Sequence, residues 1–470
     1  MDQNLLEIKA NLVNGHIDIP IDAKYTSKYS LLIRFLNTNN FRDGKEFANL
    51  IVRRNGSSYD LGRCRFISEP NINGYAGRVV CVNDVFDLES LLVNDKIVKL
   101  QNACLNLPLL LPLKNKISSK FKKYTSNLTY DLSLYKDFFD NLDAEIAEEP
   151  ESIKKALQGT IINTVGKQFM EFLDNKLVEL EEIVKNLSKE ENEDHGFYFR
   201  KQLWNTIKSS PFMARTNLKP RGYAGDSEMM SMIYANGYWG KSTFAKLLHK
   251  HPLEQPGAQA VRNRRRIIAE KLRDFKQKRC RGNSEKLKIL SVACGPACEI
   301  QDILLTAADC DRYHFVLLDQ DRAALYEAAK LIDNIQKKLD TKLTADFLNE
   351  SVRTMLAPSD SKKKMGQFDF IYSMGLFDYL LPPVASRVLG RLYEQLKPGG
   401  QMVIGNFHVS NPSKYYMEYW LDWVLYYRTE EEFTNLLRKV ASNEINVAID
   451  EAGVQMFLHV TKKHAAASSG

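Results

Sequence analysis

The spacing of hydrophobic and polar positions changes twice along the chain. Over residues 1–115, short apolar runs such as YSLLIRFL alternate with Asn, Asp and Gly turns, which predicts a β-rich, barrel-like domain. From 125 to 280, apolar residues recur every three or four positions, as in LDNKLVELEEIVKNL, which is typical of amphipathic helices. From 281 to 464, strand-like and helix-like runs alternate, which predicts an α/β domain with a doubly wound parallel sheet.

Composition and charge narrow the class of protein. The 470 residues are 44% hydrophobic and 26% charged, as in ordinary globular proteins. The net charge is +7, without a long block of like charge. The densest basic segment begins at Arg262, and its apolar residues have helical spacing. We therefore expect either an amphipathic helix with a solvated face or a basic rim that attracts an anionic substrate, and no nucleic-acid partner.

The cysteines, histidines and apolar runs bear on the cellular compartment, on membrane segments and on metal binding. Seven cysteines lack the spacing of a disulfide framework, which predicts free thiols and a cytoplasmic protein. We expect no signal peptide and no transmembrane segment, because the longest apolar run, 105–113, is short and holds two prolines. The scattered histidines predict no metal site.

One loop carries the first candidate chemistry. In ILSVACGPACEI, a buried strand runs into small residues around Gly295, and a helical pattern follows. Asp319 ends the next predicted strand, 24 residues after Gly295. A small-residue loop after the first strand and an acid at the tip of the second bind a nucleotide's ribose in open α/β sheets. The alternatives are an ordinary tight turn and a solvated strand-end carboxylate. No lysine follows the loop as in a P-loop, and Pro296 weakens a dinucleotide interpretation.

The region 286–408 resembles class I S-adenosylmethionine-dependent methyltransferases. ILSVACGPA is similar to the first motif of that family, LLDQD to its ribose motif, and FDFIYSMGLF and LKPGGQMVIGNF to its fourth and fifth. The resemblance implies a Rossmann-like domain, a parallel sheet with an antiparallel edge strand, and S-adenosylmethionine as cofactor. It implies that the cofactor lies on Ala293, Cys294, Gly295, Ala297, Asp319, Gln320, Glu350, Ser351, Val352 and Ser373. The chain departs from the family at Ser291, where many members have an acidic residue, and at Ala293 and Ala297, where glycines are expected.

Longer strings give a narrower resemblance. KPRGYAGDSEMM, AVRNRR and NPSKYYMEYWLDWVLYYRTEEE are similar to bacterial synthases of the 3-hydroxypalmitic acid methyl ester signal, which implies carboxyl O-methylation of a fatty acid for quorum sensing. The β-rich domain resembles PilZ-type barrels, which bind cyclic di-GMP. Arg53, Arg54 and the DLGR stretch from Asp60 fit that family's binding pattern poorly, so we expect a related barrel that has lost the ligand.

The acceptor determines which catalytic residues are needed. An ionised carboxylate is already nucleophilic at neutral pH and needs no general base. An alcohol would need one, for which His408 and Asp378 are candidates. Tyr223, in a loop punctuated by glycines, is a candidate to close over the cofactor.

Two groups of residues are candidates to bind the substrate. The aromatic segment 415–428 predicts a helix that is either part of the core or a cap over the pocket. Arginine pairs with carboxylates through two parallel hydrogen bonds. The candidate substrate-binding residues are Arg221, Arg262, Arg265, Trp420, Trp423, Tyr426 and Arg428.

The sequence therefore predicts a methyltransferase that esterifies a small or fatty 3-hydroxy acid, and it leaves a homodimer open. Two alternatives stay open. One is an O- or N-methyltransferase of another small molecule or peptide. The other is a non-catalytic protein that senses a nucleotide.

Overall fold

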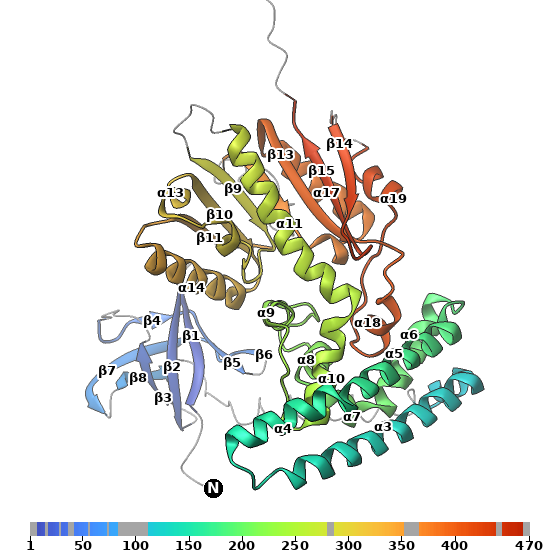
Figure 1. Cartoon of the computed structure of the whole chain (residues 1–470). Coiled ribbons are helices and arrows are strands. Elements are labelled where there is room, and N and C mark those ends of the chain that lie inside the picture. The colour runs from blue at the N-terminus through green and yellow to red at the C-terminus, as the bar shows by residue number, and fades with distance from the viewer. Residues whose placement is uncertain are drawn as a thin grey trace, which may run out of the picture. The chain divides into compact units, whose positions relative to one another are not determined.

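The computed structural model describes residues 7–14, 17–27, 30–35, 42–54, 57–72, 75–82, 111–279, 286–351, 366–438 and 444–463. The chain divides into two compact units, Met1–Leu113 and Lys114–Gly470 (Figure 1). Within the described ranges, no helix is both long enough and apolar enough to cross a bilayer.

The first unit is an antiparallel sheet, as its alternating pattern predicts. Its strand order is β4-β7-β8-β3-β2-β1-β5-β6. Alternate residues such as Leu12, Ile21 and Ile33 are fully buried, because every second side chain of a strand points to the same face. The strands are β1 Glu7–Asn14, β2 Ile17–Ser27, β3 Ser30–Phe35, β4 Glu46–Phe47, β5 Asn49–Arg54, β6 Ser57–Asp60, β7 Cys64–Ile72 and β8 Tyr75–Cys81.

The DLGR stretch of the first unit forms a local turn. The Asp60 side chain accepts hydrogen bonds from Asn49 Nδ2 and the Gly62 amide, at 2.5 and 2.8 Å. The side chains of Arg53 and Arg54 lie outside the described residues. The likeness to a PilZ barrel stays a prediction.

The second unit begins with helices. They are α2 Leu113–Lys116, α3 Ser119–Glu145, α4 Glu151–Asn163, α5 Val165–Val184, α6 Lys189–Gln202, α7 Trp204–Ser209, α8 Pro211–Leu218, α9 Ser227–Ala235, α10 Thr243–Glu254 and α11 Pro256–Arg279. Fully buried aromatic side chains, among them Phe121, Phe169 and Phe199, form their common core. The basic segment from Arg262 lies in α11 and is amphipathic: Ile268, Leu272 and Phe275 are buried. The helical region predicted from the periodicity is confirmed.

The second unit continues as a seven-stranded sheet of order β11-β10-β9-β12-β13-β15-β14. Strands β11 to β13 are parallel along this order, whereas β15 is antiparallel to both of its neighbours. The antiparallel strand is thus one position inside the edge, not at the edge as predicted, because β14 pairs with its outer side. The strands are β9 Leu287–Val292, β10 Tyr313–Asp319, β11 Thr344–Asn349, β12 Phe368–Ser373, β13 Leu396–Phe407, β14 Glu444–Ile449 and β15 Gln455–Thr461.

Helices cover both faces of this sheet. Residues of α11 and α14 (Arg322–Leu339) pack on one face with Ile289 and Phe315. Residues of α17 (Pro382–Glu394) and α19 (Glu430–Asn435) pack on the other with Leu290 and Val316. All six residues of β12 are buried, as expected for a parallel strand covered on both sides. Figure 1 shows α11 running along the sheet.

The aromatic segment 415–428 is only partly helical, which corrects the prediction of one long helix. Helix α18 spans Lys414–Tyr419, and the chain then turns, with Asp422 in the left-handed region at φ 49°. Tyr419 and Trp420 are buried among the helices of the second unit. This segment therefore joins the helical core and the sheet into one unit.

Candidate functional site

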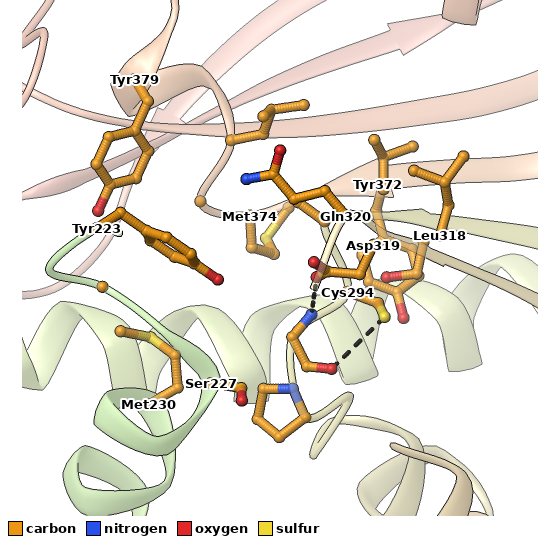
Figure 2. A pocket seen from close by; sticks show the side chains of 18 of the residues that line it. Tyr223, Ser227, Met230, Cys294, Leu318, Asp319, Gln320, Tyr372, Met374 and Tyr379 are labelled. Carbon is orange, nitrogen blue, oxygen red and sulfur yellow. Dashed lines mark hydrogen bonds between the residues drawn. The ribbon is translucent and has the colours of Figure 1, made fainter. Parts of the chain in front are cut away.

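A cavity of about 390 Å³ lies at the carboxyl ends of β9, β10, β11 and β12. This is the place where open α/β sheets bind their ligands, beside the strand at which the order reverses, and the volume suits a small molecule. Its other walls come from α9, α11 and the segment Arg221–Ser227 before α9. Figure 2 shows Tyr223 and Tyr379 on one side of the cavity and Cys294 and Asp319 on the other.

The loop after β9 has an unusual backbone. Ala293, Gly295 and Ala297 all lie in the left-handed region, at φ 53°, 55° and 50°. The Cys294 amide donates to Leu318 O at 3.1 Å, which ties the loop to the neighbouring strand β10. A Cβ added at Gly295 would meet no atom within 4 Å. The loop therefore leaves open space beside the cavity.

Asp319 is held firmly at the tip of β10. Its Oδ2 accepts the Gly295 amide and its Oδ1 the Asp321 amide, both at 2.9 Å. Burial raises the pKa of Asp319, and these hydrogen bonds oppose the rise. A carboxylate offers about four acceptor sites, so it can still accept hydrogen bonds from a ligand.

The residues beside Asp319 line the same end of the cavity. Gln320 follows it directly, and Glu350 and Ser351 come from the end of the adjacent strand β11. The Glu350 amide donates to Asp319 O at 3.1 Å. The structure thus brings together the predicted residues Cys294, Asp319, Gln320, Glu350 and Ser351, as well as Ala293 and Gly295, around one space. Val352 lies outside the described residues.

Two phenol groups lie at another side of the cavity. The rings of Tyr223 and Tyr379 meet edge to face with centroids 6.5 Å apart. Burial raises the pKa of both phenols, so both are neutral donors at pH 7. Trp423 donates from Nε1 to Tyr379 Oη at 2.7 Å. Met230, Met374 and Leu376 complete this largely apolar side.

Two of the predicted arginines line the cavity but are already paired. Arg221 pairs with Asp321 and Glu327, each at 2.9 Å. Arg265 pairs with Asp302 at 2.6 Å. Their charges are compensated within the protein, so they are weaker candidates for a substrate carboxylate than the sequence suggested. The third, Arg262, does not line the cavity; its guanidinium donates to Leu253 O and Gln259.

The predicted bases do not reach the cavity. His408 binds Ser410 Oγ through Nδ1, at 2.6 Å. Asp378 is buried behind the lining and accepts the Phe407 amide at 2.7 Å, and burial raises its pKa to about 7. Neither residue is part of the cavity lining, so the role of each as a general base stays a prediction.

Other predicted residues also lie away from the cavity. Ala297 is fully buried in the sheet core, and Ser373 donates to Val292 O at 2.8 Å between two strands. Trp420 packs among the helices, and Tyr426, 39% exposed, is not part of the lining. Trp423 is not part of the lining, but its Nε1 donates a hydrogen bond to the lining residue Tyr379.

Arg428 is a structural residue. Its guanidinium is buried and donates to Phe377 O at 2.8 Å, to Leu380 O and to Asn406 Oδ1. These bonds fix the short helix η1 (Phe377–Tyr379) against β13. No donor of Arg428 faces the cavity.

The sequence analysis missed two charged lining residues, Arg264 and Glu299. Arg264 had a detectable signal, because it lies three residues after Val261 and four before Ile268, on the buried face of α11. Glu299 had none, since a glutamate just before a helix is ordinarily solvated. Among the described residues, no group of three or more His, Cys, Asp or Glu side chains could hold a metal ion.

No family model matches the chain, and no curated protein matches its sequence. Solved structures give weak matches. A possible exported protein from Bordetella parapertussis matches with a TM-score of 0.41 and 14% identity over 56% of this chain and 96% of that chain. Magnesium protoporphyrin IX methyltransferase from Synechocystis PCC 6803 with bound SAM matches at 0.31 and 10%, over 44% and 83%.

A third match is the N-methyltransferase NodS from Bradyrhizobium japonicum WM9, at a TM-score of 0.29 and 12% identity, over 42% of this chain and 96% of that chain. TM-scores below 0.5 at such identities do not establish a relationship. The function of the cavity has to be inferred from its own geometry.

Proposed function

We propose that the chain is an S-adenosylmethionine-dependent methyltransferase. The observation that carries the proposal is the position of Asp319. It ends β10, borders the cavity, and bonds the left-handed loop after β9 through the Gly295 amide. A carboxylate at the end of the second strand, beside a small-residue loop after the first, can accept hydrogen bonds from the two hydroxyls of a ribose.

The described residues fit the cofactor. Asp319 and Gln320 offer acceptors for ribose hydroxyls, and Glu350 and Ser351 lie at the next strand end, where the base would extend. The space beside Gly295 is open, because a Cβ added there would meet no atom within 4 Å. When bound, S-adenosylmethionine supplies an electrophilic methyl group to a nucleophile.

The acceptor is proposed to be a carboxylate. No histidine is among the described residues that line the cavity, and the buried Asp378, with its pKa of about 7, does not line it. An ionised acid needs no base, so such a lining suffices. The neutral phenols of Tyr223 and Tyr379 can donate hydrogen bonds that orient the acceptor, and the enclosing walls exclude water.

The side formed by Met230, Met374 and Leu376 is proposed to receive an alkyl chain, which favours a fatty acid. The narrower sequence resemblance supports a 3-hydroxy acid. This part of the proposal rests on the apolar lining and the quoted strings together.

Labelled methyl transfer tests the proposal. The protein would be incubated with a donor carrying a deuterated methyl group and with fatty acids, 3-hydroxy fatty acids and the matching fatty alcohols. We expect the acids to give a labelled product. Mild alkali should hydrolyse this product, because it is a methyl ester. Transfer only to the alcohols would overturn the carboxylate acceptor, and no donor binding would overturn the function.

Matched aspartate variants connect the result to the site. Asp319→Ala removes the ribose acceptors and should weaken donor binding by about 2 kcal/mol, roughly 30-fold in Kd. Asp333→Ala is the control, because Asp333 lies on the exposed side of α14 and pairs with Lys337. Equal binding by both variants in calorimetry would contradict the role of Asp319.

A further inference from the structure

The wall of the cavity between α11 and the loop after β9 holds a cation that has no anionic partner among the described residues. Arg264 is 8% exposed and makes no ion pair with any described residue. Nη1 donates to Met374 O and Nη2 to Met230 Sδ, both at 3.1 Å, and Nε has no partner. Burying a guanidinium that has no carboxylate partner raises the free energy of the folded protein, unless a bound ligand supplies an anionic group.

The same wall holds a carboxylate without a cationic partner. Glu299, 7% exposed, lines the cavity and accepts a hydrogen bond from Tyr372 Oη at 2.6 Å. Among the described residues it forms no ion pair. Burial raises the pKa of Glu299, while the hydrogen bond from Tyr372 and the charges of Arg265 and Arg264 lower it. A cation bound beside Glu299 would relieve this desolvation.

The two groups are neighbours that leave each other unpaired. The charges of Arg264 and Glu299 both shift the pKa of the partly buried Tyr234, in opposite directions, and all three residues line the cavity. An ion pair would have been the simplest way to compensate both charges. Both side chains instead line the cavity without an ion pair between them.

We propose that Glu299 and Arg264 form a receptor for the zwitterionic amino acid end of the cofactor, with Glu299 binding the α-ammonium and Arg264 the α-carboxylate. This inference rests on the proposed function and deepens it. A guanidinium fork matches a carboxylate through charge-assisted hydrogen bonds. Ser291, which lines the same wall, offers only a hydroxyl, so the acid comes from Glu299 instead.

The neighbouring arginines do not compete for this role. Arg265 is neutralised by Asp302 and Arg221 by Asp321 and Glu327. Among the described residues, Arg264 is thus the lining arginine that makes no ion pair, and its charge partly offsets the rise in the pKa of the buried Asp378. The rival role for Arg264 is to bind the acceptor's carboxylate, and the experiment distinguishes the two.

Calorimetry with two ligands tests the inference. S-Adenosylhomocysteine has the adenosine and the amino acid end, whereas 5′-methylthioadenosine keeps the adenosine and thioether and lacks that end. We expect Glu299→Gln and Arg264→Gln each to weaken S-adenosylhomocysteine binding about 10- to 100-fold. Binding of 5′-methylthioadenosine should change less than about twofold, which also reports that each variant is folded.

Surface variants of the same type are the controls. Arg266→Gln and Glu270→Gln alter an exposed pair on α11 and should change neither ligand's affinity. If the wild-type chain bound both ligands equally, or if the site variants weakened both equally, the receptor would be overturned while the adenosine site stood. If Arg264→Gln raised only the KM of the acceptor acid, the rival role would hold. Binding of neither ligand by the wild-type chain would overturn the proposed function as well.

Discussion

At the scale of single residues, two alanines of the loop after β9 adopt a backbone conformation that favours glycine. Ala293 and Ala297 adopt left-handed φ values, which cost a residue with a Cβ about 1–2 kcal/mol each. The surrounding structure maintains them: Ala297 packs in the sheet core, and Ala293 follows a fully paired buried strand. Strain of this kind concentrates at binding sites.

Ala293→Gly should therefore stabilise the protein. Glycine removes the left-handed penalty but adds unfolded-chain entropy of about 0.5–1 kcal/mol, so we expect the free energy of unfolding to rise by about 0.5–1 kcal/mol. The control Ala329→Gly, inside α14, should lower it by about 1 kcal/mol. Urea unfolding followed by tryptophan fluorescence checks both, since all four tryptophans lie in the second unit. A similar loss of unfolding free energy in both variants would contradict the inference that Ala293 is strained.

At the scale of elements, a buried ion pair helps to position the segment before α9. Asp226 caps α9 by accepting the Met229 amide at 3.0 Å. It also accepts three hydrogen bonds from Arg215 of α8, at 2.7, 2.9 and 3.0 Å. Its side chain is 1% exposed. The segment with Tyr223 is thereby held against the cavity from behind.

Asp226→Ala should loosen this segment. It removes the cap and leaves Arg215 partly buried with fewer partners, so we expect a loss of about 3 kcal/mol in the free energy of unfolding. Glu228→Ala removes the exposed partner of Arg215 and should cost less than about 1 kcal/mol. The difference between the two unfolding curves is the measurement. Equal losses would show that the buried pair does not position the segment.

At the scale of the whole molecule, the cavity belongs to one unit. Every residue that lines it falls between Arg221 and Tyr379, and the second unit spans Lys114–Gly470. Its helical core and its sheet share the aromatic segment around Trp420. The helices and the sheet therefore build the site together.

The fragment Lys114–Gly470 should bind S-adenosylhomocysteine with a Kd within about twofold of that of the full chain, because a compact unit with its own core can fold alone. Calorimetry on both proteins measures this. A folded fragment, judged by circular dichroism, that bound more than about tenfold more weakly would contradict the assignment of the complete site to this unit.

Prediction from sequence succeeded where the signal was local. The loop around Gly295 and the acid at Asp319 were found because each directly follows a strand-like run. The sequence did not reveal the direction of a side chain. Asp378 and His408 lie in the expected segments, yet their side chains turn toward the backbone near β13.

The sequence alone determined the alternation of strands and helices, and with it the strand ends at which Asp319 and Gly295 lie, because periodicity and spacing are properties of neighbouring residues. Only the tertiary structure decided that Arg264 and Glu299, from α11 and the loop before α12 (Ile300–Ile303), face one space without pairing, and that Trp420 belongs to the core. Such relations depend on how elements far apart in the chain pack, and no local pattern encodes them.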